Sequence, residues 1–181
     1  MLKTRDILDE KNKILRLPSK DVVFPLDKKD LKNIDLMIEY LTNSQIEDKA
    51  LKYDLRPGMG MAAIQIGVPK RYITIVDEVE NGFDTYVVIN PKIISNSTEM
   101  IYVEQGEGCL SVNREVEGIV PRYARVTVEG YDINENKIRI RAREDLAIAF
   151  QHEIDHLNGI LFVDHIDTKN PMKNAKNYRA I

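Results

Sequence analysis

The stretch Gln-His-Glu-Ile-Asp-His at residues 151–156 is the feature of this 181-residue sequence that most constrains the fold. In a helix, positions i and i+4 share one face, so His152 and His156 can direct their rings at one point. Glu153 lies about 100° further round the helix and can reach a water molecule without ligating a metal. The stretch therefore predicts a helix that holds a metal ion beside a general base.

The residues around this stretch also favour a helix. Phe150, Ile154 and Leu157 give it apolar surface to bury, and Gly159 suits a left-handed cap at its C-terminal end. Two core histidines that match the pattern by chance are the alternative. The glutamate in register between them favours the metal-binding interpretation.

A catalytic metal site of this kind requires a third protein ligand and one open position. The protease pattern HExxHxxGxxH needs a histidine where this chain has Phe162, and a second protease pattern needs a downstream glutamate, but none follows Glu153. Asp164, His165 and Asp167 lie too close behind the helix, and we expect His165 to be a surface residue or to support a ligand. The usual protease completions therefore fail.

Cys109, within Glu-Gly-Cys-Leu-Ser at residues 107–111, is the other strong candidate ligand. Thiolate and imidazole both suit zinc and ferrous iron. A lone cysteine is more often a small buried hydrophobic residue. Here, however, the helix site lacks a ligand, and the adjacent glycine lets the backbone come close. The sequence therefore favours Cys109 as the third ligand of one divalent metal ion.

The composition is that of an ordinary globular protein, with 43% hydrophobic and 30% charged residues. No repeat or linker divides the chain, so we expect residues 1–181 to form a single catalytic domain. No apolar run approaches the roughly 20 residues of a membrane span, and the charged N-terminus does not resemble a secretory signal. A single cysteine excludes an intrachain disulfide and predicts a cytoplasmic location.

The net charge of −3 offers no general basic surface, so we expect no specific nucleic-acid partner and no membrane partner. The tail is the exception, because it has four cations and no acid after Asp167. We expect it to be solvated, with a weak phosphate contact as the alternative. Its cations are Lys169, Lys173, Lys176 and Arg179.

The order of predicted elements indicates an α+β fold, with antiparallel β-sheets packed around a C-terminal metal-binding helix and with an N-terminal helix. β-branched and aromatic residues mark the strands, and alternation on both sides of residues 134–136 marks a hairpin. Residues 58–67 are predicted to be a loop. The expected helices are 27–41, 46–51 and 144–158, and the expected strands are 71–79, 85–94, 99–112, 125–133 and 137–143.

Gly58, Gly60 and Ala63 in the predicted loop match the weak dinucleotide-binding pattern GxGxxA. That pattern should follow a strand and open a helix within a βαβ unit. Here a polar helical segment precedes the loop and strands follow it. Nucleotide binding is therefore disfavoured.

Three motifs, in this order, resemble those of the peptide deformylases: GMGMAAIQ at residues 58–65, EGCLS at 107–111 and QHEIDH at 151–156. The resemblance implies a metal-dependent hydrolase that removes the formyl group from the N-terminal formyl-methionine of nascent polypeptides and releases formate. The segment before the first motif and the short tail resemble the Gram-positive-type branch.

Two positions depart from the motifs of this family, which usually has leucine at Met61 and proline at Ile64. Methionine conserves the volume of leucine. Without proline, one φ angle is not fixed in the loop that presents Gln65. We expect a tuning effect rather than loss of function.

The resemblance also implies the parts that individual residues play. Glu153 would move the proton, while the Gln65 amide and the Leu110 N–H would hold the developing oxyanion. Iron(II) is implied in the cell, with zinc, nickel or cobalt as replacements, and a transient ribosome contact is plausible for an enzyme that acts on nascent chains. The implied metal ligands are Cys109, His152 and His156; the implied substrate-binding residues are Gly58, Met59, Gly60, Ile148 and Ala149.

Two other interpretations stay open at this point. One is an HExxH-type metallopeptidase that uses the same helix, although its downstream ligand is missing. The other is a structural metal site or peptide-binding module closed by a fourth protein ligand, for which His165 is the only spare histidine.

Overall fold

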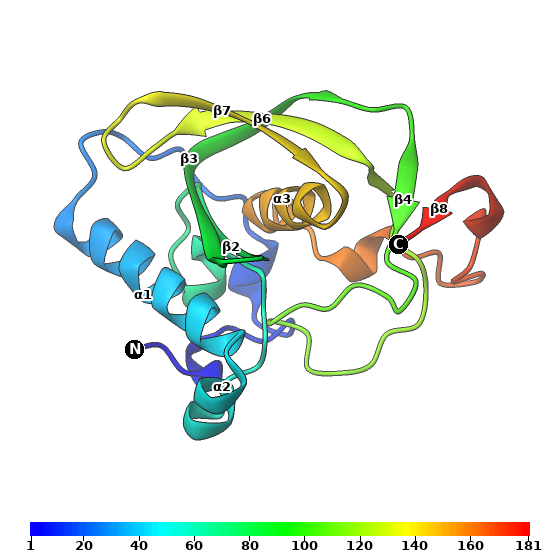
Figure 1. The fold of residues 1–181 in the computed structure, drawn as a ribbon, viewed down its shortest axis with the longest axis horizontal. Helices are drawn as coiled ribbons and strands as arrows, with labels where there is room; N and C mark the ends of the chain where they lie inside the picture. The colour runs from blue at the N-terminus through cyan, green and yellow to red at the C-terminus, as the bar shows by residue number, and fades with distance from the viewer.

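Helix α3 (Glu144–Leu157) lies at the centre of the computed structural model, which describes residues 1–181 (Figure 1). Its residues Ala147–Ile154 form an unbroken buried run. A helix that is buried all round is normally hydrophobic all round. This one carries histidine, glutamate and glutamine in its buried part, so other elements must supply their partners.

The strands form two sheets around α3. They are β1 (Gly60–Ala62), β2 (Tyr72–Val79), β3 (Gly82–Asn96), β4 (Met100–Tyr102), β5 (Arg122–Tyr123), β6 (Arg125–Tyr131), β7 (Lys137–Arg143) and β8 (Arg179–Ala180). The five-stranded sheet, in the order β1-β2-β3-β6-β7, is antiparallel throughout. In the other sheet β4 pairs antiparallel with β5 and parallel with β8.

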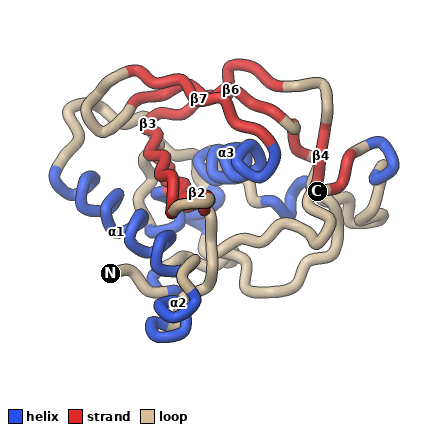
Figure 2. Tube along the Cα trace, viewed as in Figure 1, coloured by secondary structure: helices blue, strands red, loops and turns tan.

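Figures 1 and 2 show how these sheets enclose the helix: β6 and β7 pass over it, β2 and β3 lie on one side, and β4 and β8 lie on the other. The prediction of an α+β fold with antiparallel sheets around the C-terminal helix is therefore confirmed. The predicted left-handed cap is also present, because Gly159 has a φ of +75°.

The N-terminal helix is also confirmed, as α1 (Lys28–Ser44), which packs against β2. It begins after Asp27, whose side chain accepts a hydrogen bond from the Asp30 N–H at 2.7 Å. A second helix, α2 (Glu47–Tyr53), follows close to the predicted segment 46–51. No helix has the length and apolar content needed to cross a bilayer.

The β6–β7 hairpin forms where the alternation predicts it, with Tyr131 opposite Lys137. The Asp132 carboxylate closes the turn by accepting hydrogen bonds from the N–H groups of Asn134 at 2.8 Å and Asn136 at 2.9 Å. Such side-chain to backbone bonds are the reason that Asp and Asn favour turns.

The prediction of a loop at residues 58–67 is wrong. Residues Gly60–Ala62 form β1, which pairs with β2, and Ala63–Ile66 form a short 3-10 helix. Met61 and Ile64 are fully buried, so packing fixes this segment where a proline is absent. A three-residue strand is too short to show a period in the sequence.

Two further expectations need correction. Within the predicted strand 99–112 only Met100–Tyr102 is a strand, and the residues beyond it form the loop that carries Cys109 to α3. The tail is not simply solvated, because β8 joins the second sheet. Arg179 in β8 makes ion pairs with Glu99 at 2.9 Å and Glu144 at 2.7 Å.

Gly159→Ala is expected to destabilise the protein more than Gly67→Ala. Both glycines have left-handed backbones, with φ of +75° and +77°, which costs an L-residue about 1–2 kcal/mol. At Gly159, however, an added Cβ would lie 2.6 Å from the Arg16 carbonyl oxygen, whereas nothing lies within 4 Å at Gly67. Urea unfolding of both variants measures the difference. Equal losses would show that the contact with Arg16 is not restrictive.

Candidate metal centre

Helix α3 brings His152 and His156 together, with 5.0 Å between their ring centroids. Cys109 approaches from the loop after β4, and its Sγ lies 3.3 Å from His156 Nε2. All three side chains are buried, and one ligand atom from each lies within 4.8 Å of the other two. The two histidine side chains of the helix and the cysteine side chain of the loop therefore converge on one point.

Glu107 fixes the orientation of His152, because its carboxylate lies 2.9 Å from His152 Nδ1. Arg122 holds the other side of Glu107 through hydrogen bonds of 2.7 and 3.0 Å. Burial alone would raise the pKa of Glu107, but hydrogen bonds and charge from His152 and Arg122 lower this pKa to about 2. A carboxylate on Nδ1 leaves Nε2 to face a metal, as outer partners of metal-bound histidines commonly do.

The two histidines differ in their electrostatic surroundings. Burial, and then the charge of nearby His152, lowers the pKa of His156 well below its ordinary value, which favours the neutral, metal-binding form. Burial would also lower the pKa of His152, but Cys109 and Glu107 raise it well above its ordinary value. A cation bound at Nε2 of His152 would replace the proton there, while the Nδ1 proton stays with Glu107.

Glu153 is the general-base candidate, and its carboxylate has no complete set of partners. Its Oε2 is buried without a hydrogen bond. Burial raises the pKa of Glu153 to about 7, and the negative charge of Glu107 adds to this rise. The positive charges of His152 and Arg122 lower the pKa but do not cancel the effect of burial. A nearby divalent cation would favour the ionised form. The buried oxygen without a partner, beside a thiol and two imidazoles, fits a metal ion with an associated water molecule.

Gln65 lies across from these residues on the 3-10 helix after β1. Its Oε1 accepts a hydrogen bond from the Ala62 N–H at 2.8 Å, and its Nε2 donates to Ser111 Oγ at 3.1 Å. The same Nε2 lies 3.9 Å from Cys109 Sγ. Both ends of the amide are therefore held, and its nitrogen faces the metal centre.

A cavity of about 320 Å³ opens beside the three candidate ligands. His156 lies behind it and is only 1% exposed. The other residues predicted for the site all line the cavity: Gly58, Met59, Gly60, Gln65, Cys109, Leu110, Ile148, Ala149, His152 and Glu153.

His165 lies outside the cluster of candidate ligands. It contacts Asp155 at 2.7 Å, and Asp155 in turn contacts Arg122 at 2.5 Å. The cluster thus contains three side chains, the number typical of catalytic zinc sites, whereas structural sites are closed by four.

Sequence reasoning missed four residues that shape the site. Glu107 lies in the motif EGCLS, two residues before Cys109, so its charge could have indicated a partner for a metal-binding histidine. Ser111 is also in that motif, but its contact with Gln65 depends on the fold. Arg122 and Arg56 lie in no motif, and no local pattern marks their long-range contacts.

Comparisons with known proteins agree with this geometry. The family model described as "Polypeptide deformylase" matches residues 4–172. The chain is 47% identical to peptide deformylase 2 of Bacillus anthracis over 172 residues, which cover 94% of each protein. It is 44% identical to peptide deformylase 2 of Bacillus subtilis over 182 residues, covering 100% of this chain and 99% of that protein.

Solved structures show the same fold. A probable peptide deformylase from a Synechococcus phage superposes with a TM-score of 0.72 at 33% identity, covering 88% of this chain and 98% of the other. The Met-Ala-Ser-bound class I type b peptide deformylase of Acinetobacter baumannii gives 0.70 at 30% identity, covering 88% and 96%. The metallopeptidase interpretation gains no support from these relatives, and the chain belongs to the peptide deformylase family.

Proposed function

We propose that Cys109, His152 and His156 hold one divalent metal ion with which this deformylase hydrolyses the formyl group of N-formyl-methionyl peptides. The observation that carries the proposal is the unpaired, buried oxygen of Glu153 beside three convergent ligand atoms at a cavity. Three ligands leave a coordination position open for chemistry.

A formamide is a poor electrophile, and its nitrogen is a poor leaving group. A bound divalent ion would polarise the formyl oxygen and acidify a water molecule towards a pKa of about 7. As the oxygen of the attacking water bonds to the formyl carbon, the water loses a proton, and Glu153 accepts that proton. Glu153 then delivers that proton to the departing nitrogen, so one residue serves as base and acid while formate leaves.

Two donors are available for the oxyanion that develops on the formyl oxygen. Leu110 lines the cavity, and its N–H donates to no backbone acceptor. Gln65 Nε2 carries two hydrogens: it donates to Ser111 Oγ at 3.1 Å and makes a long contact of 3.9 Å with Cys109 Sγ, which the formyl oxygen would replace. Donors held in place before the reaction stabilise the transition state without reorganisation.

The substrate would lie along the edge of β1. This strand begins at Gly60 and ends the five-stranded sheet, so its outer edge is free to pair with an extended peptide. Gly58 and Met59 precede the strand and line the cavity, where they would flank the peptide. Ile148 and Ala149 on α3 offer an apolar wall for the methionine side chain. The bound Met-Ala-Ser in the Acinetobacter baumannii deformylase supports a peptide with N-terminal methionine as the ligand class.

Iron(II) is our proposal for the metal in the cell, with zinc, nickel or cobalt able to replace it. The support is the donor set, because one thiolate and two imidazoles suit zinc and ferrous iron alike. We also propose that residues 1–181 act as one catalytic domain in the cytoplasm, where nascent formylated chains are made.

A transient contact with the ribosome is the last element of the proposal. Of the four tail cations, Lys173 is paired with Asp167 at 2.7 Å and Arg179 with Glu99 and Glu144. Lys169 and Lys176 are exposed and are therefore the residues available for a phosphate.

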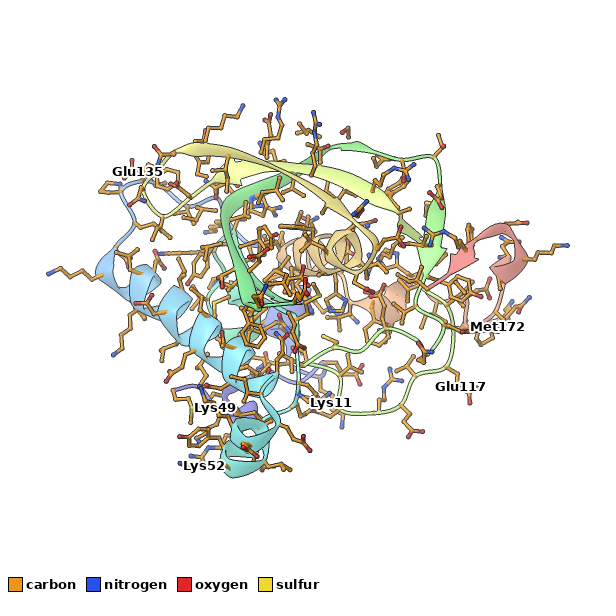
Figure 3. All side chains as sticks on the ribbon, viewed as in Figure 1. Lys11, Lys49, Lys52, Glu117, Glu135 and Met172 are labelled. Atoms are coloured by element: carbon orange, nitrogen blue, oxygen red, sulfur yellow. The ribbon has the colours of Figure 1, made fainter.

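Formate release tests the proposed function. Protein purified anaerobically, with metal content measured, is expected to release formate from formyl-Met-Ala-Ser. Glu153→Ala is expected to lose about 10²- to 10⁴-fold in kcat while it keeps its metal, because the reaction loses its proton carrier. Glu117→Ala, on an exposed loop (Figure 3), is the matched control and should match wild type. A metal-loaded wild type without formate release would rule the function out.

Gln65→Leu is expected to lower kcat by about 10²- to 10³-fold, the usual cost of one oxyanion donor. Metal content should not change, because Gln65 is not a ligand. The comparison variant is Gln105→Leu, an exposed glutamine on the loop before Glu107. Full activity in Gln65→Leu would remove this residue from the mechanism.

Lys169→Glu combined with Lys176→Glu is expected to weaken co-sedimentation with ribosomes. Loss of two phosphate contacts should lower the slope of log binding constant against log salt by about two. The control is Lys49→Glu with Lys52→Glu, which alters two exposed lysines at α2 (Figure 3). If both double variants bind like wild type, the tail makes no ribosome contact.

A further inference from the structure

We infer that Arg56 is a positioning residue that orients the peptide groups of residues 109–111 towards the metal centre; this inference rests on the function proposed above. Arg56 lies in the segment before β1, 53 residues from Cys109 in the sequence. It is neither a candidate ligand nor one of the groups assigned to the reaction.

The Arg56 guanidinium holds the backbone of the cysteine loop at three carbonyl oxygens. Nη2 donates to the carbonyls of Cys109 at 3.0 Å and Val112 at 3.2 Å, and Nη1 donates to that of Leu110 at 3.3 Å. Nη1 also donates to the side chain of Asn113. All four acceptors are uncharged oxygens, so the planar fork rather than charge neutralisation defines the contact.

The loop depends on this contact because it has little regular structure. Residues 109–113 belong to no helix or strand. The carbonyls of Leu110 and Val112 accept no backbone hydrogen bond. Buried carbonyls are nearly always paired, and Leu110 and Val112 are only 7% and 3% exposed. Arg56 supplies the partners that a strand would otherwise provide.

The peptide plane converts this contact into an orientation of N–H groups. In a trans peptide the C=O and the following N–H are coplanar and point in opposite directions. Because Arg56 binds the Cys109 oxygen, the Leu110 N–H must point away from Arg56 and remain available for the oxyanion. Because Arg56 binds the Leu110 oxygen, the Ser111 N–H points to Cys109 Sγ, 3.4 Å away. The Val112 N–H also donates to the Cys109 carbonyl at 3.1 Å, so Arg56 shares the control of the first peptide plane, whereas it is the sole hydrogen-bond donor to the Leu110 carbonyl. Arg56 thus orients both an oxyanion donor and a donor to the sulfur.

Arg56 is itself held in place from two other parts of the fold. Its backbone N–H donates to Thr4 Oγ1 at 3.3 Å, and its carbonyl accepts from the Tyr40 hydroxyl at 3.2 Å. Tyr40 is fully buried on α1. The N-terminal segment and α1 therefore fix the backbone from which the guanidinium reaches the cysteine loop.

The test compares Arg56→Met and Arg56→Lys with Arg114→Met. Arg114 is on the same loop, but its guanidinium contacts only Glu10. Arg56→Met is expected to lower kcat by about 10²-fold, the effect of a misplacement near 1 Å, with KM little changed. Arg56→Lys keeps the charge but not the fork and should be only partly rescued, and Arg114→Met should match wild type.

Two readouts do not depend on turnover. In cobalt-loaded protein, the near-ultraviolet thiolate-to-cobalt charge-transfer absorption is expected to shift in Arg56→Met, since the Ser111 N–H leaves the sulfur. Amide hydrogen exchange in residues 109–113 is expected to speed up in the same variant but not in Arg114→Met. If Arg56→Met does not fold, Arg56→Lys provides the same measurements.

Three results would overturn the inference: kcat and KM both unchanged in Arg56→Met, a raised KM at unchanged kcat, or an unchanged cobalt spectrum and exchange rate. The second would mean that Arg56 contacts the peptide, since it lines the cavity. Absence of formate release by wild type would instead remove the proposed function. The spectrum and the exchange rates would still decide whether Arg56 orients the loop.

Discussion

The structure depends on one constraint: the polar groups on the buried helix α3 must find partners away from water. Burying a polar group without a partner is costly. Gln151 meets it by exchanging two hydrogen bonds of 2.9 Å with the backbone of Tyr123, which docks β5 on the helix. His152 meets it through Glu107. Glu153 Oε2 and His156 Nδ1 remain without a hydrogen bond, and of these two residues Glu153 lines the cavity.

The charged partners extend this constraint beyond the helix. Arg122 is 3% exposed and joins Glu107 to Asp155, so a buried cation lies between two carboxylates. Removing one member of such a buried set leaves an uncompensated charge, and buried pairs are therefore costly to break. The long loop between β4 and β5 has little regular structure, yet it is anchored at Glu107 and at the carbonyls that Arg56 holds.

Sequence patterns predicted the parts of the molecule that are determined by residues close together in the sequence. Helix α3 and the β6–β7 hairpin are long enough to show the periodic placement of apolar residues that is typical of a helix and of strands. The spacing of His152 and His156 places both side chains on one face of the helix. Other features arise only in three dimensions. β1, β5 and β8 have two or three residues each and exist because a neighbouring strand pairs with them. The contacts of Arg56 join segments more than fifty residues apart, and no period or motif records such a pairing.

Strand β8 has a consequence for the dynamics of the cavity. Its parallel pairing with β4, and the ion pair between Arg179 and Glu99, join segments 80 residues apart, a slow closure for a folding chain. The Glu104 N–H also donates to the Ile181 carbonyl at 3.0 Å, directly after Val103 at the cavity wall. Strand β8 has only two residues, both exposed, and short exposed strands with few buried contacts open first. Fraying of β8 would therefore loosen the rim of the cavity while the ligands on α3 stay in place.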